Sequence, residues 1–238
     1  MKKILSFVVD HTLVKVSNYV ASKINTPVKS ENKPNVYKYL WEKAIIESAS
    51  YIEPKLNEVM LFKNRKQIWD FTLSKVNTEG LFIEFGVFQG TSINYFSSKL
   101  TNHHFYGFDS FEGLAEDWIG HHAAKGTFNL HGKLPEVNTN VTLFKGWFEE
   151  SIPHFLNNNN EFISFIHVDA DTYDATKTIF DLMGSRIRKG TIILFDEYIG
   201  YPNWKNGEYL AWKEFVDKND ITYRYLGFSN EQAVIEIY

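Results

Sequence analysis

The acidic residues best placed to do chemistry form two close pairs, and each pair directly follows a short apolar run. The four residues are Asp169, Asp171, Asp196 and Glu197. If the two runs are neighbouring strands of a parallel sheet, the four carboxylates meet in the crevice at its carboxyl edge. Carboxylates crowded in this way repel one another unless a cation lies among them or some take up protons. The pattern favours a hard divalent cation such as Mg²⁺, Mn²⁺ or Ca²⁺, with scattered helix caps and salt bridges as the plainer alternative.

A glycine-containing turn is the second chemically suggestive feature. It runs from Glu84 through Gly86 and Gly90 to Thr91 and Ser92, where a helical stretch begins. The glycines allow the backbone to approach a ligand closely, and a helix N-terminus offers free N–H groups. A carboxylate beside the turn suits a ligand with an ammonium group, and the spacing differs from the G-x-G-x-x-G dinucleotide fingerprint. We predict a ligand-binding turn here, with a tight structural turn as the alternative.

Two further strand ends carry groups that suit a nucleoside. Asp109 follows the glycine turn at the spacing expected for a carboxylate that accepts both hydroxyls of a ribose. Ser110 and Phe111 come directly after it, and Gly146 and Trp147 follow the next apolar run. A flat indole there can stack on an adenine. The alternatives are a turn-forming aspartate and an ordinary core tryptophan.

Taken together, four motifs resemble the macrocin O-methyltransferase family, metal-dependent class I enzymes that methylate sugar hydroxyls in antibiotic biosynthesis. The motifs lie at Glu84–Ser92, Gly107–Leu114, His167–Tyr173 and Phe195–Tyr198. The resemblance implies that the methyl donor is S-adenosylmethionine. The residues expected to bind it are Glu84, Gly86, Gly90, Thr91, Ser92, Asp109, Ser110, Phe111, Gly146, Trp147 and Asp169.

The same resemblance assigns roles to the acidic residues. Asp169 is implied to be a metal ligand that takes part in catalysis, and Asp171 is implied to be the general base. Asp196 and Glu197 are implied to complete the metal site. In the family this last pair is often Asp-Asp, so Glu197 departs from the pattern, although its longer side chain can still reach a metal.

Short apolar runs that alternate with helical stretches predict an α/β fold with a parallel sheet covered on both faces. The runs are Leu81–Gly86, Phe105–Asp109, Val141–Phe144, Phe162–Val168 and Thr191–Phe195, then Thr222–Leu226 and Ala233–Tyr238. Only about six residues join the last two runs, so they are expected to form an antiparallel hairpin. The result is a Rossmann-like class I methyltransferase fold, with a seven-stranded, mostly parallel sheet and a C-terminal antiparallel hairpin.

Helices are expected at Met60–Val76, Thr91–Leu100, Tyr173–Ile187 and Glu208–Lys218. Residues 1–62 are predicted to form an N-terminal helical appendage, acting as a lid or an interface, and residues 63–238 the methyltransferase domain. A connection as long as Leu114–Asn140 usually has a function, and here we expect it to close over the acceptor. Within it, His121 and His122 are an alternative metal-binding or basic pair.

The composition of the chain limits its expected binding partners and its expected cellular location. The chain has 238 residues, a formal net charge of −4 and no strong basic block, so nucleic acid is not an expected partner. It contains no cysteine, which excludes disulfides and thiolate metal sites. The apolar run within Met1–Asp10 is too short for a signal peptide or a transmembrane segment. We therefore expect a cytoplasmic protein, and the aromatic-rich N-terminal region leaves a homo-oligomer as one expectation.

The combined prediction is an S-adenosylmethionine-dependent, divalent-metal-dependent O-methyltransferase acting on a hydroxyl of a sugar or another small polar acceptor. An NAD-dependent oxidoreductase is one alternative, opposed by Glu84, the glycine spacing and the antiparallel ending. A non-catalytic relative that binds S-adenosylmethionine is another. A methyltransferase for an amine or a carboxyl acceptor is a third, and independence from metal would distinguish it.

Overall fold

The computed structural model describes residues 35–76 and 79–238. The chain divides into two compact units, Met1–Val36 and Tyr37–Tyr238, and the second unit contains the sheet. Most of the expected N-terminal appendage therefore lies outside the described residues. Of that appendage, the structure describes the helix α2 (Val36–Ile52), the short 3₁₀ turn η1 (Glu53–Lys55) and the residues that follow.

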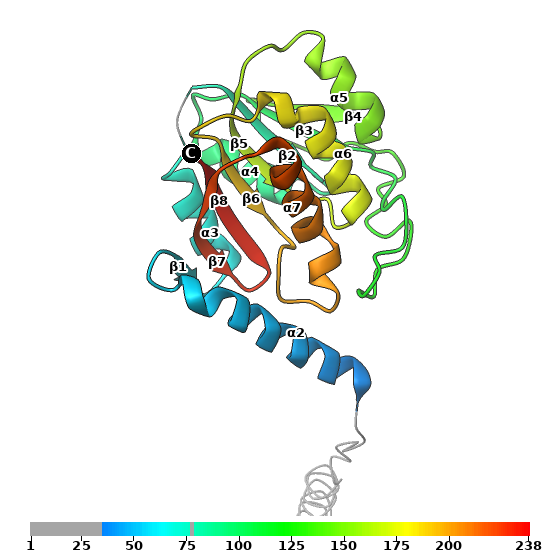
Figure 1. Cartoon of the computed structure of the whole chain (residues 1–238). Helices are drawn as coiled ribbons and strands as arrows, with labels where there is room; N and C mark the ends of the chain where they lie inside the picture. The colour runs from blue at the N-terminus through cyan, green and yellow to red at the C-terminus, as the bar shows by residue number, and fades with distance from the viewer. Residues whose placement is uncertain (1–34, 77–78) are drawn as a thin grey trace, which may run out of the picture. The chain divides into compact units, whose positions relative to one another are not determined.

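Within the described residues, eight strands form one sheet in the order β1-β7-β8-β6-β5-β2-β3-β4 (Figure 1). Their bounds are β1 Met60–Phe62, β2 Leu81–Phe85, β3 Phe105–Asp109, β4 Val141–Lys145, β5 Ile163–Val168, β6 Ile192–Phe195, β7 Tyr223–Ser229 and β8 Gln232–Ile237. Strand β8 runs antiparallel to β6 and β7, and all the other neighbours are parallel. The predicted fold class, a mostly parallel sheet with a C-terminal antiparallel hairpin, is confirmed.

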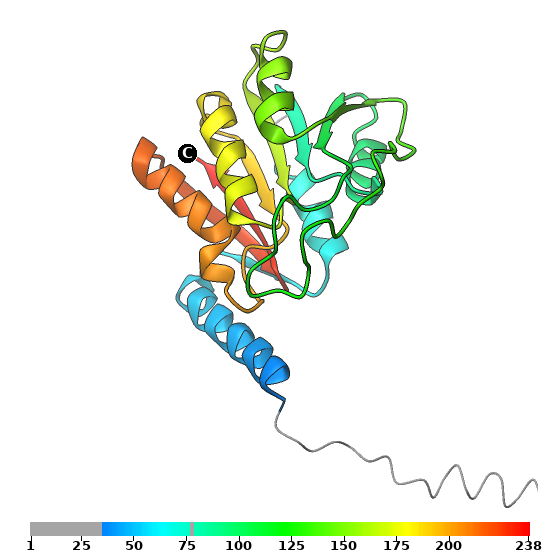
Figure 2. The same cartoon turned by 90° about the vertical axis from the view of Figure 1, so that its right-hand side faces the viewer.

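Helices cover both faces of this sheet. Their bounds are α3 Arg65–Leu73, α4 Thr91–Lys99, α5 Phe148–Leu156, α6 Tyr173–Met183 and α7 Glu208–Asn219, with 3₁₀ turns η2 Gly184–Arg186 and η3 Trp204–Asn206. Helices α5, α6 and α7 pack side by side on one face, and α3 and α4 lie on the other (Figure 2). The result is a three-layer arrangement, which is typical of parallel sheets.

The central strands are buried along their whole length, as expected for parallel strands covered on both faces. Side chains alternate between the two faces. In β2, Ile83 and Phe85 pack toward α5–α7, whereas Phe82 packs toward α3 and α4. Glu84 must share the face of Phe82, and by the same alternation His167 of β5 shares it too. The two polar side chains therefore meet beneath α3 and α4.

One element differs in kind from its prediction. Met60–Phe62 was expected to begin a helix but forms strand β1, which pairs in parallel with β7 and adds an eighth strand to the predicted seven. The helix begins at Arg65 because the side chain of Asn64 caps it, accepting a hydrogen bond from the Gln67 N–H at 3.1 Å. A three-residue edge strand is too short to show the two-residue alternation that identifies strands.

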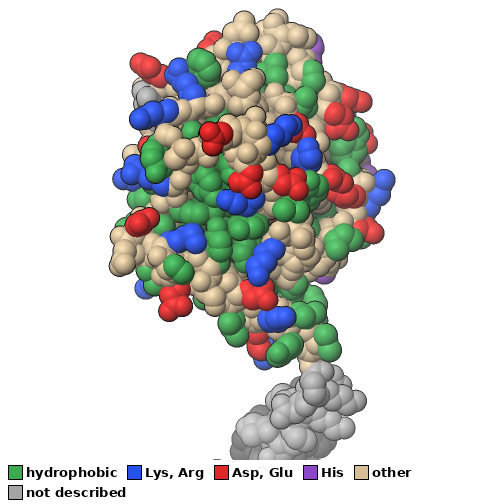
Figure 3. Space-filling view, viewed as in Figure 1, with side chains coloured by type: hydrophobic (Ala, Val, Ile, Leu, Met, Phe, Trp, Pro, Cys, Tyr) green, Lys and Arg blue, Asp and Glu red, His purple; other side chains and the backbone are tan. Residues whose placement is uncertain are grey.

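None of the helices in residues 35–76 and 79–238 has the length and apolar character needed to cross a membrane. The face shown in Figure 3 carries Lys and Arg side chains interspersed with Asp and Glu. Such mixing gives this face no single-sign patch.

Candidate active site

A cleft of about 590 Å³ opens at the carboxyl ends of the central strands. From β2 the chain winds outward through β3 and β4, and from β5 it winds the other way through β6. The boundary between β2 and β5 is therefore the topological switch point, where open α/β sheets bind their ligands.

Eleven of the fourteen predicted site residues line this cleft. They are Gly86, Thr91, Ser92, Asp109, Ser110, Gly146, Trp147, Asp169, Asp171, Asp196 and Glu197. The other three do not line it. Gly90 precedes α4 in a left-handed conformation, and Phe111 is buried in the apolar cluster under α3 and α4. Glu84 is fully buried on the same face of the sheet.

The glycine turn packs directly against the first acidic loop. Gly86 has φ +87°, and a Cβ added there would overlap the Asp169 carbonyl oxygen. The Asp169 N–H donates to the Phe85 carbonyl at 2.9 Å. A glycine is thus required both by the backbone conformation and by the close approach. Because α4 starts without a side-chain cap at Gly90, its first N–H groups are available to a ligand.

Asp109 is held in a fixed orientation at the end of β3. Its Oδ2 accepts a hydrogen bond from the Phe88 N–H and its Oδ1 accepts one from the Phe111 N–H, each at 2.7 Å. Burial raises the pKa of Asp109, and these backbone bonds oppose that rise. Each carboxylate oxygen keeps a further lone pair, so the group can still accept two ligand hydroxyls from the cleft.

The acidic residues fall into two overlapping groups of potential ligands. Asp169, Asp171 and Glu197 form one group and His167, Asp169 and Asp196 the other, with the ligand atoms of each group within 4.8 Å of one another. Asp169 belongs to both. The Glu197 Oε2 is buried and has no hydrogen-bond partner. The structure thus brings together the four carboxylates that the sequence placed after β5 and β6.

Burial and mutual repulsion raise the pKa of three of these carboxyls. Burial and the neighbouring Asp196 raise the pKa of Asp169 and of Glu197. The same two causes raise the pKa of Asp171 to about 8, and its backbone is left-handed at φ +61°. A bound cation would reverse this shift because it stabilises the ionised form.

Asp196 differs from the other three because protein donors surround it. The Arg65 guanidinium and the Gln232 side-chain amide both donate to its carboxylate. The Nε2 of His167 lies 3.6 Å from Asp196 Oδ1. Burial would raise the pKa of Asp196, but His167 and Arg65 outweigh it and hold the pKa below its usual value.

The buried His167 links Asp196 to Glu84. Its Nδ1 lies 3.0 Å from Glu84 Oε2, and the Ser92 hydroxyl donates to the other Glu84 oxygen at 3.0 Å. Burial alone would lower the pKa of His167, but Asp196 and Glu84 raise it to about 10. Protein groups therefore neutralise the Glu84 carboxylate. Direct contact between Glu84 and the methyl donor stays a prediction, and the full burial of Glu84 does not favour it.

Another buried carboxyl, Glu208 at the start of α7, joins the two acidic loops. Its Oε1 accepts a hydrogen bond from the Ala170 N–H, and its Oε2 accepts one from the Glu197 N–H, each at 3.2 Å. Ala170 stands between Asp169 and Asp171. Burial raises the pKa of Glu208 to about 8, and these bonds oppose the rise. One side chain thus fixes the spacing of both loops.

Sequence reasoning did not find Arg65, His167 or Glu208 as site residues. Arg65 and Asp196 are 131 positions apart, and no local pattern connects them. His167 lies in a quoted motif, and the alternation of side chains along β5 could have paired it with Glu84. Glu208 carries no signal beyond being an acidic residue in the first turn of a helix.

The connection between β3 and β4 forms the outer wall of the cleft. Residues 110–140 contain only turns and bends, and they contribute Trp118 and His121 to the lining. The rings of these two residues stack at 4.0 Å. Neither His121 nor His122 belongs to a potential metal-binding group among the described residues. The position of the connection suits the predicted lid, and its closure stays a prediction.

Known proteins resemble this chain in domain and in fold. Residues 83–198 match the family model described as a methyltransferase domain. No curated protein matches the chain. The solved structure of CalS11, a calicheamicin methyltransferase, is similar with TM-score 0.59 and 21% identity, covering 90% of this chain and 87% of that one. The O-methyltransferase NovP is similar with TM-score 0.56 and 16% identity, covering 71% and 78%.

The apo structure of CalS11, described as a TDP-rhamnose 3'-O-methyltransferase, gives TM-score 0.53 at 21% identity, covering 90% of this chain and 88% of that one. At these identities the likeness establishes the fold. The matched methyltransferase domain is consistent with the observed sheet order and with the position of the cleft at the switch point.

Proposed function

We propose that this chain, a methyltransferase by its matched domain and with the class I methyltransferase fold, transfers a methyl group from S-adenosylmethionine to a hydroxyl of a sugar or another small polar acceptor. We also propose that the transfer requires a divalent cation. The observation that carries the proposal is that one cleft is lined by eight of the eleven predicted donor-binding residues and by the acidic cluster. We also propose, from the four sequence motifs, that the chain is related to the macrocin O-methyltransferase family.

The donor side of the cleft fits S-adenosylmethionine. Asp109 has lone pairs free to accept the two ribose hydroxyls. Trp147, half-buried after β4, offers a flat face to the adenine. The uncapped start of α4 at Thr91 offers N–H groups to the carboxylate of the methionine part.

The acidic side of the cleft fits a hard cation. Its donors are carboxylate oxygens, the ligand type that Mg²⁺ and Mn²⁺ prefer, and the Glu197 Oε2 lacks a partner. We propose Asp169, Asp196 and Glu197 as the residues that hold the cation, with Asp169 common to both potential groups. When bound, the cation would lower the pKa of an acceptor hydroxyl.

Asp171 is proposed as the general base. Transfer forms a bond between the acceptor oxygen and the methyl carbon as the carbon–sulfur bond of the sulfonium breaks, and the hydroxyl proton must leave. Asp171 lines the cleft beside Asp169, and this position supports the assignment because a base must lie within reach of the proton it takes. In-line transfer would also require the walls of the cleft to hold the oxygen, carbon and sulfur in a line.

The neighbours support an oxygen acceptor. NovP is an O-methyltransferase, and CalS11 acts on TDP-rhamnose by its description. No observation of the cleft favours the oxidoreductase alternative. A cytoplasmic location, a homo-oligomer and a lid or interface role for residues 1–62 stay predictions.

Calorimetric titration of S-adenosylmethionine, with and without Mg²⁺, tests the proposal. The wild-type protein and Asp217→Ala, a change on the exposed side of α7, are expected to bind the donor. Asp109→Ala is expected to lose binding because the ribose hydroxyls lose their acceptor. Binding of NAD(H) without binding of S-adenosylmethionine would contradict the proposal.

A further inference from the structure

A second cavity of about 110 Å³ adjoins the main cleft. It lies between the β3–β4 connection, the start of α6 and the segment around η3. Trp118, Asp171 and Asp174 line both cavities. A ligand can therefore extend from the main cleft into the small cavity while passing the proposed base, Asp171.

Two buried polar groups on the wall of this cavity have no hydrogen-bond partner. The Tyr201 hydroxyl belongs to a side chain that is 1% exposed, and the Trp118 indole N–H to one that is 6% exposed. The rings of these two residues lie edge to face, with their centroids 5.6 Å apart. Buried polar groups are almost always satisfied in native proteins. An oxygen of a ligand placed between them would satisfy both.

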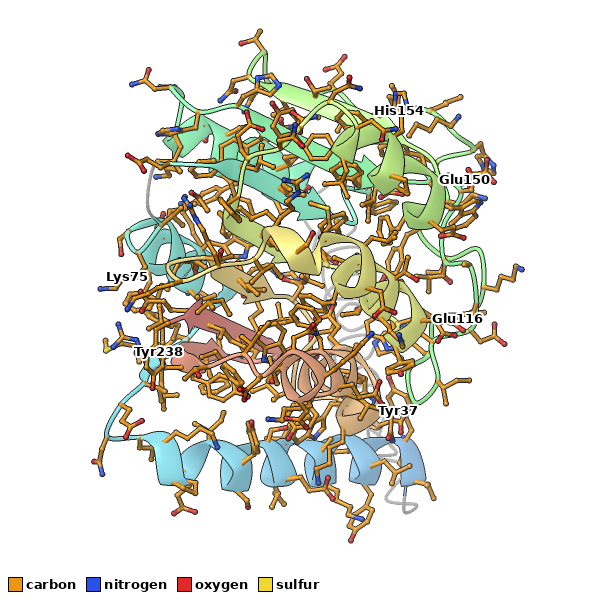
Figure 4. All side chains as sticks on the ribbon, turned by 45° about the horizontal axis from the view of Figure 1, so that its top comes forward. Tyr37, Lys75, Glu116, Glu150, His154 and Tyr238 are labelled. Atoms are coloured by element: carbon orange, nitrogen blue, oxygen red, sulfur yellow. The ribbon has the colours of Figure 1, made fainter. Side chains whose placement is uncertain are left out.

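All the charged side chains that line the small cavity are acidic. Glu116, Asp117 and Asp174 line the cavity, and none of them takes part in an ion pair with any described residue. Among the residues that line it, all of them described, there is no Lys, Arg or His. Glu116 lies on the connection where it runs beside α6 (Figure 4).

We propose that the small cavity is an acceptor subsite for a sugar ring that bears a protonated amine. The Tyr201 hydroxyl and the Trp118 N–H bind a ring oxygen or hydroxyl, and the three carboxylates bind the ammonium group. This assignment rests on the proposed function, because it takes the molecule in the subsite to be the methyl acceptor.

The same charges disfavour a sugar carried on a nucleoside diphosphate. Across the lining of both cavities, all of which is described, the only Lys or Arg is Arg65, and its guanidinium is paired with Asp196 and near Glu197. A diphosphate in the small cavity would therefore face its carboxylates without a Lys or Arg to offset them, which costs binding energy. In this respect the chain is expected to differ from CalS11, which is described as acting on TDP-rhamnose.

The test is a binding titration of paired acceptor probes to the full chain saturated with S-adenosylhomocysteine and Mg²⁺. The probes are the methyl glycosides of 2-, 3- and 4-amino hexoses, each with its N-acetylated counterpart, together with TDP-rhamnose. At least one amine is expected to bind more tightly than its N-acetyl partner. Its affinity should fall as NaCl is raised, because salt screens exposed charges.

Variants separate a charge effect from a structural one. Asp117→Asn is expected to weaken binding of the amine about fivefold, the scale of one exposed ion pair, and to leave the N-acetyl probe unchanged. Asp217→Asn, on the exposed side of α7, should change neither. Tyr201→Phe should weaken both members of the pair, since it removes a bond to the ring and not to the amine.

Three outcomes would overturn the assignment. They are failure of every amine to bind, equal binding by amines and N-acetyl partners, and binding of TDP-rhamnose at least as tight as that of the best amine. If S-adenosylhomocysteine itself does not bind, the proposed function fails before the subsite is reached. The two failures are therefore distinguishable.

Discussion

Glu208→Gln is the most informative single substitution because Glu208 contacts both acidic loops and is not itself a proposed metal ligand. In wild type its two oxygens each accept one backbone N–H, from Ala170 and from Glu197, at 3.2 Å. A carboxyl has lone pairs on both oxygens in either protonation state, whereas the nitrogen of an amide has none. Glutamine can therefore accept only one of the two bonds.

The size of the effect follows from the lost bond. A buried backbone N–H left without a partner costs about 1–3 kcal/mol. In a domain of this length, each kcal/mol of lost unfolding free energy lowers the melting temperature by about 2–4 °C, so the melting temperature should fall by roughly 2–12 °C. Because the released loop carries proposed metal ligands, affinity for Mn²⁺ should also fall by about 10–100-fold, as for other groups that orient metal ligands.

The assay combines thermal unfolding in EDTA with calorimetric Mn²⁺ titration of the folded protein. Glu214→Gln is the matched control, since it makes the same chemical change on the exposed side of the same helix, where Glu214 accepts a hydrogen bond from the Tyr173 hydroxyl. It should leave the Mn²⁺ affinity unchanged. If Glu208→Gln matches wild type in both measurements, the two hydrogen bonds do not hold the loops, and the reasoning is refuted.

Three other predictions concern the same cleft. Gly86→Ala should destabilise the fold by at least about 3 kcal/mol. The new Cβ would overlap the Asp169 carbonyl oxygen, and alanine would also be strained at this positive φ. Gly126→Ala, which is equally left-handed but has no neighbour near its Cβ, should cost only about 1 kcal/mol in chemical denaturation. Asp171→Asn should retain calorimetric binding of S-adenosylmethionine while kcat falls by about 10²–10⁴-fold, and an unchanged kcat would remove it as the base. Adding Mn²⁺ at 100 times its Kd should raise the free energy of unfolding by about 2.7 kcal/mol, and this gain should vanish in Asp169→Asn.

The frame of the sheet was predictable because buried parallel strands are nearly continuous apolar runs. Strands β2, β5 and β6 are short, apolar and bounded by polar or glycine residues, and all three were identified. Helix α5 was not predicted. It is only nine residues long and contains Pro153, which argues against a helix when the sequence is read locally.

The acidic loops were predictable as a cluster, but their internal contacts were not. Strand adjacency brings Asp169 close to Glu197, and the sequence shows that adjacency through the alternation of strands and helices. The partners of Asp196 are different. Arg65 comes from α3 and Gln232 from β8, so they reach Asp196 only after the sheet has assembled. Contacts of this kind depend on tertiary packing and leave no periodic signal.

The irregular connection across residues 110–140 also bears on how this fold acquires new substrates. Its two ends are anchored on neighbouring strands, where the Phe105 N–H donates to the Asn140 carbonyl at 2.9 Å and β3 pairs with β4. Between these anchors it forms a wall of both cavities, while the acidic loops arise from β5 and β6. On the proposed function, this part of the acceptor wall and the acidic loops are therefore encoded in separate stretches of the gene. Exchanging the segment between relatives should shift acceptor preference while the acidic loops stay unchanged.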